Sequence, residues 1–372
     1  DFLSRYETQQ VNEHLTNIRN NPYELSQFED YKNELVNASI MIFRKDCLRS
    51  LFFILAAGLL IILFLYRKLK ESTFLLLLGV LVLIDLWAVD KRYLNNKKKG
   101  AKYFQWVDSY KYNNPFKATV ADIEIMKYEM EAAPIIKQKI DDEVSRLRKD
   151  RKLRFAEFRN EQIKVRFREL NFLTNYRTLS LQNPFNESKT SYFHKSIGGY
   201  HGAKLKKYQE LIEFQISREI NYINDVLDSE YTSESIDDLL KNDIPVLNML
   251  NTRYIIDKPS ESPIVNPYCY GNAWFADNIK FVKNADEEIL SLSGIDRNTV
   301  ILNEKYKNKI GADIIYDSTA TIQLKSYKPN HLVYESSAQY DQFAIFSEIF
   351  FEDGWNAYID GKKAEYFRAN YV

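Results

Sequence analysis

Two long apolar runs, separated by a short basic loop, constrain the fold of this chain more than any other feature. The first run covers residues 50–66 (SLFFILAAGLLIILFLY) and has no charge, and the second covers residues 72–89 (STFLLLLGVLVLIDLWAV) and is interrupted only by Asp85. A helix needs about 17–25 mostly apolar residues to cross a bilayer. A helix that is apolar on every side must be buried in protein or in lipid. The sequence therefore predicts a transmembrane hairpin over residues 47–94, with its turn in the loop 67–71.

Composition narrows the function classes. The 372 residues suffice for two or three domains, and 51 Lys+Arg balance 51 Asp+Glu, so the basic excess of a nucleic-acid-binding protein is missing. Cys47 and Cys269 are the only cysteines and lie far apart, which excludes a disulfide framework and a cysteine-based zinc site. Aromatic residues make up 14% of the chain, which is typical both of sugar-handling, β-rich surfaces and of ordinary AT-rich bacterial proteins. Because the chain begins at Asp1 rather than Met and ends at Val372 within a predicted strand, we expect a piece of a longer protein.

Helical patterns flank the hairpin. Residues 1–46 are predicted to be a membrane-proximal helical segment, and residues 118–170 are dense in charge and helix formers, as in a solvated amphipathic helix. A strand is predicted at residues 171–181 (NFLTNYRTLSL). Residues 95–250 are therefore expected to be a mostly helical region. Its clearest element is one long amphipathic helix from about residue 203 to 227, whose apolar positions are Leu205, Tyr208, Ile212, Ile216, Ile220, Ile223 and Leu227.

Strand patterns dominate residues 251–372. Residues 243–256 (DIPVLNMLNTRYII) read as a short helix followed by a strand, and residues 321–324 and 331–337 read as paired strands. Asp360-Gly361 supplies the positive φ angles that a tight hairpin needs. Repeated short strands with turns predict an antiparallel β-sandwich. The expected fold class is thus α+β, with a two-helix transmembrane hairpin, a mixed helical region and a C-terminal antiparallel β-sandwich.

No catalytic motif is present, since the chain has no Gly-rich phosphate loop, no HExxH and no GxSxG. The most unusual segment is 191–204 (SYFHKSIGGYHGAK), with two His, two Tyr, two Lys and three Gly. Glycines let the backbone approach a ligand, and the start of the following helix favours anions. We predict a polar pocket for phosphate or sugar hydroxyls, or alternatively a loop whose glycines serve only the turn. The pocket residues would be His194, Lys195, Gly198, Gly199, Tyr200, His201 and Lys204.

Two further features leave alternatives open. His194 and His201 are seven residues apart, which is not the usual spacing of a metal-binding pair; a pairing across the glycines is possible, but the prediction is no metal site. Asp85 lies inside an apolar run, where a carboxylate is costly and often functional. It is only four residues from Val89, however, and a position level with the lipid headgroups explains it equally well.

Several segments resemble one family of membrane proteins. Residues 179–211, 245–256 (PVLNMLNTRYII), 266–275 (NPYCYGNAWF), 346–362 (FSEIFFEDGWNAYIDGK) and 368–372 (RANYV) resemble the extracytoplasmic region of bacterial YfhO-family proteins of the Bacteroidetes type. The resemblance implies a polytopic, GT-C-like glycosyltransferase that moves a sugar from a polyprenyl-phosphate carrier to a cell-envelope acceptor. In such enzymes the general base or metal-coordinating acid usually lies in the first extracytoplasmic loop, so catalytic residues are expected upstream and none is assigned here. No cofactor is expected in this fragment.

The resemblance also implies a location. It places the hairpin in the inner (cytoplasmic) membrane, residues 95–372 outside the cytoplasm and the loop 67–71 inside. Counting Lys and Arg alone would turn the basic flanks of the hairpin inward, and we follow the resemblance because upstream spans can fix the orientation. The expected partners are the bilayer, the polyprenyl-phosphate sugar and an envelope glycan or lipid acceptor, without nucleic acid. The fragment is expected to be an accessory, acceptor-positioning part. The alternative is a non-catalytic, membrane-anchored carbohydrate-binding or scaffold protein.

Overall fold

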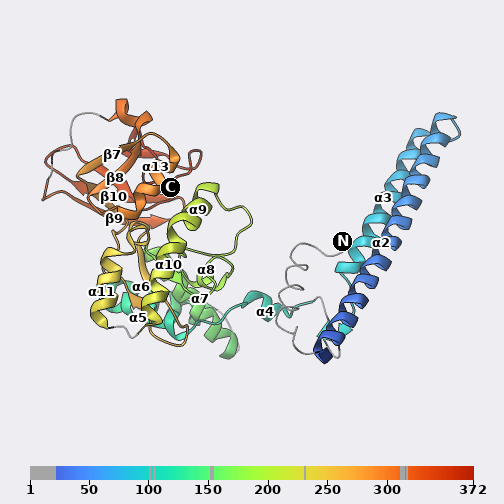
Figure 1. The fold of residues 1–372 in the computed structure, drawn as a ribbon, viewed down its shortest axis with the longest axis horizontal. Helices are drawn as coiled ribbons and strands as arrows, with labels where there is room; N and C mark the ends of the chain where they lie inside the picture. Colours follow the sequence, from blue (N-terminus) through green and yellow to red (C-terminus); the bar gives the residue numbers. More distant parts are fainter. Residues whose placement is uncertain are drawn as a thin grey trace. The chain divides into compact units, whose positions relative to one another are not determined.

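The chain forms two compact units, which lie within residues 1–112 (the hairpin unit) and 113–372 (the C-terminal unit). The structure is a computed structural model that describes residues 22–99, 102–103, 106–150, 155–229, 232–310, 315 and 317–372 (Figure 1). The part of the predicted membrane-proximal segment that covers residues 1–21 lies outside the described residues. Each unit is described by itself below.

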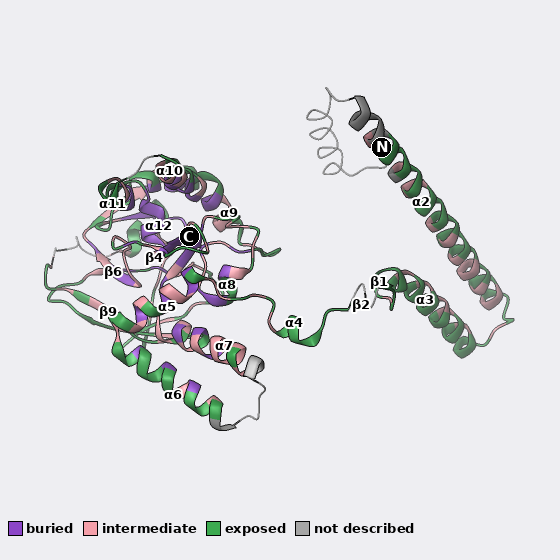
Figure 2. Cartoon of the chain, turned by 90° about the horizontal axis from the view of Figure 1, so that it is seen from below, coloured by how far each residue is buried: buried purple, intermediate pink, exposed green. Residues whose placement is uncertain are grey.

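The hairpin unit contains two long helices, α2 (Pro22–Leu65) and α3 (Glu71–Tyr93). Both are long and apolar enough to cross a membrane by length and composition. Arg67 takes a positive φ of 55° in the turn between them, and the rings of Phe64 and Phe74 stack with centroids 4.6 Å apart beside that turn. Among the described side chains of the two helices none is buried (Figure 2), so their apolar surface needs a cover such as lipid.

Two ion pairs join α2 to α3. Nη1 of Arg92 lies 2.6 Å from Oδ1 of Asp46, and Nη1 of Arg49 lies 3.5 Å from Oδ1 of Asp85. Arg49 directly precedes the first apolar run, so its partner Asp85 lies level with the edge of that run. This geometry favours the interpretation in which Asp85 stands at the level of the headgroups.

Three helices take the place of the single charged helix expected over residues 118–170. They are α5 (Val120–Ala132), α6 (Pro134–Asp150) and α7 (Phe155–Leu173), and the expectation for residues 151–154 lies outside the described residues. A capping box between Thr119 and Asp122 starts α5. Pro134 forces the break before α6 because its ring has no N–H to continue the α5 hydrogen-bond series. The three helices share a core of Met126, Ile136, Ile140, Val144, Val165, Phe167 and Leu170, joined by Phe193.

The strand expected at residues 171–181 is shorter than predicted. Helix α7 continues to Leu173 because Leu170 is fully buried in the core that α7 shares with α5 and α6. The strand β3 covers only Arg177–Ser180. It pairs in parallel with β4 (Thr252–Ile256), which pairs antiparallel with β5 (Ile264–Val265). Only the second half of the expected strand is therefore confirmed.

The long amphipathic helix is confirmed, with a start at Lys206 rather than near residue 203. It runs as α9 (Lys206–Leu211), one π-helical turn (Ile212–Ile216) and α10 (Ser217–Leu227). The predicted apolar face is the buried one, with Ile212, Ile216, Ile220 and Ile223 in the core. Helices α11 (Ser233–Asn242) and α12 (Pro245–Met249) follow, and α12 with β4 confirms the helix-then-strand prediction for residues 243–256.

The remaining strands form small, separate sheets. β6 (Ala273–Ala276) pairs antiparallel with β11 (Phe343–Phe346), and β9 (Thr321–Lys328) pairs antiparallel with β10 (His331–Ser337). β12 (Ala357–Ile359) and β13 (Lys362–Ala364) form the predicted hairpin, with positive φ angles at Asp360 and Gly361.

One pair in this region is parallel. β7 (Asn278–Val282) and β8 (Thr299–Asn303) run in the same direction, joined by α13 (Ala285–Ser291) and a short 3₁₀ turn, because parallel strands need a crossover connection. The α+β class is thus confirmed. The described strands form sheets of two or three strands with two parallel pairs, and they do not show a closed antiparallel sandwich.

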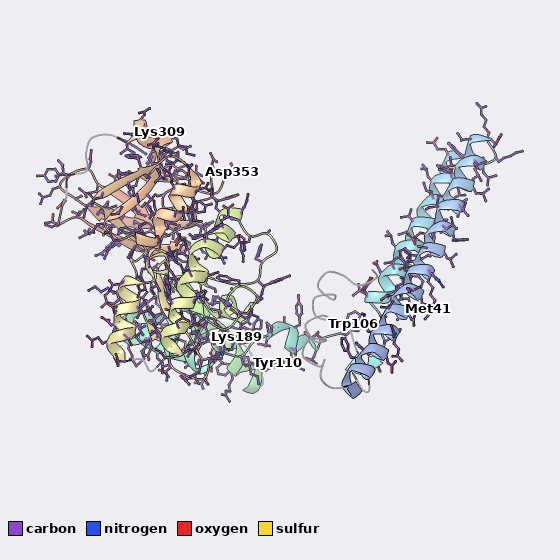
Figure 3. The ribbon with its side chains drawn as sticks, in the orientation of Figure 1. Met41, Trp106, Tyr110, Lys189, Lys309 and Asp353 are labelled. Atoms are coloured by element: carbon purple, nitrogen blue, oxygen red, sulfur yellow. The ribbon has the colours of Figure 1, made fainter. Side chains whose placement is uncertain are left out.

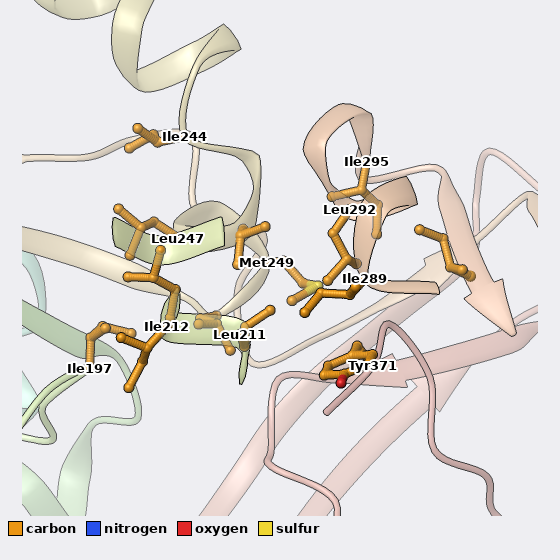
Figure 4. Packing of buried hydrophobic residues seen from close by; sticks show 14 of the residues in the cluster. Ile197, Leu211, Ile212, Ile244, Leu247, Met249, Ile289, Leu292, Ile295 and Tyr371 are labelled. Carbon is orange, nitrogen blue, oxygen red and sulfur yellow. The ribbon is translucent and has the colours of Figure 1, made fainter. Parts of the chain in front are cut away.

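One hydrophobic core joins the helical and strand regions of the C-terminal unit. Figure 4 shows residues of the α9–α10 helix and α12 packed beside α13, the following turn and Tyr371. The same cluster includes Leu179 of β3 and Ile345 of β11. The predicted boundary at residue 250 therefore falls within a continuous core.

Candidate functional site

The predicted pocket segment 191–204 lies between α8 (Lys189–Phe193) and α9. His194 ends α8 and is buried. Its Nε2 donates to Oδ1 of Asp122 across 3.1 Å, and its ring meets Phe167 edge to face. Burial alone raises the pKa of Asp122, but the hydrogen bonds from His194 and Thr119 outweigh it and lower this pKa. His194 therefore ties α8 to the start of α5.

Lys195 points to different partners. Its Nζ donates to the carbonyl oxygen of Asn171 across 2.8 Å and to that of Thr174, and it lies 3.6 Å from the centre of the Tyr327 ring. Burial lowers the pKa of Lys195 to about 7, while the charge of Glu348 raises it and that of Arg177 lowers it. This amine satisfies two carbonyls at the end of α7, which would otherwise lack donors.

The glycines of the segment have distinct roles. A Cβ on Gly198 would lie 1.8 Å from the carbonyl oxygen of Pro184, so only glycine fits there. Gly199 has a φ of +108° and donates its N–H to the same oxygen across 2.7 Å. These glycines bring the backbone close to residue 184 of the chain itself.

Of the other predicted pocket side chains, those of Tyr200 and His201 are exposed and that of Lys204 is half-buried. The Tyr200 side chain is 71% exposed, and Nδ1 of the exposed His201 accepts the N–H of Ala203 across 3.0 Å. Nζ of Lys204 lies 5.4 Å from the centre of the Phe185 ring. The structure therefore groups neither the buried His194 nor the half-buried Lys195 with Tyr200, His201 and Lys204.

Lys195 belongs to another polar group, which we call the Lys195 cluster: Asn175, Arg177, Lys195, Tyr327, Tyr334 and Glu348. Arg177 on β3 donates through Nη1 to the carbonyl oxygens of Leu250 and Ser347, across 2.8 and 2.6 Å. Its Nη2 lies 3.6 Å from Oε2 of Glu348. Nδ2 of Asn175 donates to Oε1 of Glu348 across 2.8 Å.

Two tyrosines of the β9–β10 hairpin complete the Lys195 cluster. The Tyr327 ring carries the Lys195 ammonium on its face. The Tyr334 hydroxyl is buried and has no hydrogen-bond partner among the described residues. Burial raises the pKa of Tyr334 well above its usual range, and the charge of Glu348 raises it further.

The chemistry open to the Lys195 cluster is binding rather than bond making. Lys195 and Arg177 are already occupied by main-chain acceptors, and Tyr334 offers a buried hydroxyl that can bond a polar group. Within the described ranges, no group of three or more His, Cys, Asp or Glu side chains is placed to hold a metal ion. The cluster joins β3, the 191–204 segment, the β9–β10 hairpin and the residues after β11.

Sequence patterns do not reveal this cluster. Of its members only Lys195 stands in the unusual 191–204 segment, and Arg177 and Glu348 are 171 residues apart in the chain. Only the tertiary fold brings them together. Comparison of the chain with protein-family models, with curated proteins and with solved structures found no match in any of the three.

Substitutions at His201 and Lys204 test whether this part of the 191–204 segment contributes to stability. We expect His201→Ala and Lys204→Ala each to change the free energy of unfolding by less than about 0.5 kcal/mol, because neither side chain holds a buried group. Urea unfolding followed by tryptophan fluorescence measures this. A loss of more than about 1 kcal/mol in either variant would show that the surface part of the loop is structural.

Proposed function

We propose that the chain is part of a polytopic membrane glycosyltransferase that moves a sugar from a polyprenyl-phosphate carrier to a cell-envelope acceptor. In this proposal α2 and α3 cross the inner membrane, and the C-terminal unit stands outside the cytoplasm, where it positions the acceptor or covers the active site. The observation that carries the proposal is the pairing of two unburied apolar helices with a separately packed α+β unit. The resemblance of residues 179–211 and 346–362 to YfhO-family proteins supplies the reaction class.

The contacts of the C-terminal unit support an accessory role. The most deeply buried carboxylates are bound to the protein itself: Glu219 to the N–H groups of Val246 and Leu247, Glu288 to Arg368 and the N–H of Tyr371, and Asp122 to His194. Groups held in this way stabilise a fold and are poorly free to attack a sugar phosphate. The same observation supports the second candidate, a non-catalytic, membrane-anchored carbohydrate-binding or scaffold protein.

Sugar transfer in proteoliposomes separates the two. We expect the chain 1–372 to transfer no sugar from a polyprenyl-phosphate donor, since its described residues offer no acid–base constellation. We expect the complete gene product to transfer sugar, and its variant without residues 113–372 to use the acceptor poorly. Transfer by the chain 1–372 alone would show that the enzyme active site lies within it. If the complete gene product is inactive with polyprenyl-phosphate sugars, the result would favour the second candidate, the non-catalytic carbohydrate-binding or scaffold protein.

A further inference from the structure

The segment that follows α3 is unusually basic and aromatic. Residues 91–112 contain seven Lys or Arg and one acidic residue, Asp108, which gives a net charge of +6. The loop at the opposite end of the hairpin, residues 67–71, has three basic residues and Glu71. The two ends of the hairpin therefore differ strongly in charge.

The described side chains of this segment are directed to solvent. Lys91, Lys97, Lys98 and Lys111 are exposed, and Arg92 forms an ion pair with Asp46. Trp106 and Tyr112 are 64% and 78% exposed, and Tyr110 belongs to α4 (Ser109–Asn113); Figure 3 labels Trp106 and Tyr110. Amphipathic rings next to lysines match the boundary between headgroups and acyl chains, where tryptophan and tyrosine are enriched.

Local contacts hold basic and aromatic side chains of the segment near one another. Nζ of Lys91 lies 4.7 Å from the centre of the Trp87 ring in the last turns of α3. Nε1 of Trp106 donates to Oδ1 of Asn96 across 3.0 Å, which ties the indole to the residue that directly precedes Lys97 and Lys98. Such a group presents positive charge and apolar ring surface together.

We infer that the described basic and aromatic residues of this segment form a binding surface for anionic phospholipid headgroups, on the leaflet that lies at the end of the hairpin opposite the loop 67–71. These residues are Lys91, Lys97, Lys98, Trp106, Lys111 and Tyr112. Polybasic segments next to a membrane span are attracted to anionic lipids through the surface potential, and this attraction falls off within a Debye length. The aromatic rings then insert at the interface. The inference rests on the membrane placement of the hairpin and is independent of any sugar transfer.

A fluorescent label on the segment tests the inference in the full chain. In a Cys47→Ser/Cys269→Ser background, Val107→Cys would carry an environment-sensitive fluorophore, in nanodiscs of phosphatidylcholine alone or with added phosphatidylglycerol. We expect a blue shift of the emission maximum when phosphatidylglycerol is present, and its loss at high salt. The shift is also expected to be lost in the variant Lys97→Gln/Lys98→Gln/Lys111→Gln.

The matched control is Arg67→Gln/Lys68→Gln/Lys70→Gln at the other end of the hairpin, which should keep the shift. Equal emission in neutral and anionic discs, or an undiminished shift in the Lys97/Lys98/Lys111 variant, would overturn the inference. A second label at Leu59, which is exposed near the middle of the apolar run 50–66 of α2, reports insertion. A water-like spectrum there would overturn the membrane placement on which both the inference and the transferase proposal rest, whereas a failure confined to the Val107 label would overturn the inference alone.

Discussion

Replacing Gly198 with alanine is expected to destabilise the C-terminal unit by about 3 kcal/mol or more. A Cβ at this position would lie 1.8 Å from the carbonyl oxygen of Pro184 and 2.6 Å from the carbonyl carbon. Both atoms are backbone, so neither can swing aside. The same oxygen accepts the N–H of Gly199, and a shift of residue 184 would break that bond as well.

Urea unfolding of the full chain measures the effect through the fluorescence of Trp274, which is only 2% exposed. Gly202→Ala is the matched control, because a Cβ there meets no atom within 4 Å. We expect this control to unfold at nearly the same urea concentration as the wild-type chain. Equal midpoints for Gly198→Ala and wild type would contradict the close approach of the 191–204 segment to Pro184.

Replacing Glu219 with methionine is expected to cost about 2–4 kcal/mol. Glu219 is fully buried in α10, and its two carboxyl oxygens accept the N–H groups of Val246 and Leu247 across 2.8 and 2.9 Å. These donors belong to the first turn of α12, which has no other partner for them within the helix. Methionine has similar bulk but leaves both buried N–H groups without an acceptor.

The effect of this substitution should depend on pH. Burial raises the pKa of Glu219 from 4.5 to about 8, although the hydrogen bonds from Val246 and Leu247 oppose the shift. Between these two values the folded protein binds more protons than the unfolded chain, so stability falls as the pH rises from 4.5 to 8. The Glu219→Met variant has no carboxyl group at this position, so its stability lacks this pH dependence. The difference in the free energy of unfolding between wild type and variant should therefore shrink as the pH rises from 4.5 to 8.

Urea unfolding curves at pH 4.5 and at pH 8 measure both the loss of the hydrogen bonds to α12 and its dependence on pH. Glu213→Met serves as the matched control, since Glu213 is exposed in the same continuous helix and, among the described residues, accepts only from Gln209. We expect the control to leave stability nearly unchanged at either pH. A deficit for Glu219→Met that stays constant with pH would contradict the raised pKa, and the lack of any deficit would contradict the bonds to α12.

Local patterns were enough to predict the elements whose signals are local. The apolar runs predicted α2 and α3, the apolar stripe from Leu205 to Leu227 predicted the α9–α10 helix, and Asp360-Gly361 predicted the β12–β13 turn. In each case the deciding residues are neighbours in the chain. The break at Pro134 was visible in the sequence as well, but the continuous run of helix formers around it obscured it.

Long-range pairing decided the rest. Whether residues 171–181 form helix or strand depends on α5, α6 and β4, which pack against the two halves of the segment. The parallel pairs β3–β4 and β7–β8 have no local signature, and for this reason the expected antiparallel sandwich does not describe these sheets. The candidate site shows the same limit: Lys195 stood out in the sequence, but its partners Arg177 and Glu348 are set by the fold.

The central claim is that a membrane hairpin carries the C-terminal unit outside the cytoplasm, and cysteine labelling in intact spheroplasts tests it most directly. In the Cys47→Ser/Cys269→Ser background, Ser337→Cys places a thiol on the exposed end of β10 and Lys68→Cys places one in the hairpin turn. With a membrane-impermeant maleimide, Ser337→Cys should be labelled in intact spheroplasts and Lys68→Cys only after lysis. Labelling of Ser337→Cys only after lysis, or of both sites on one side of the membrane, would contradict it.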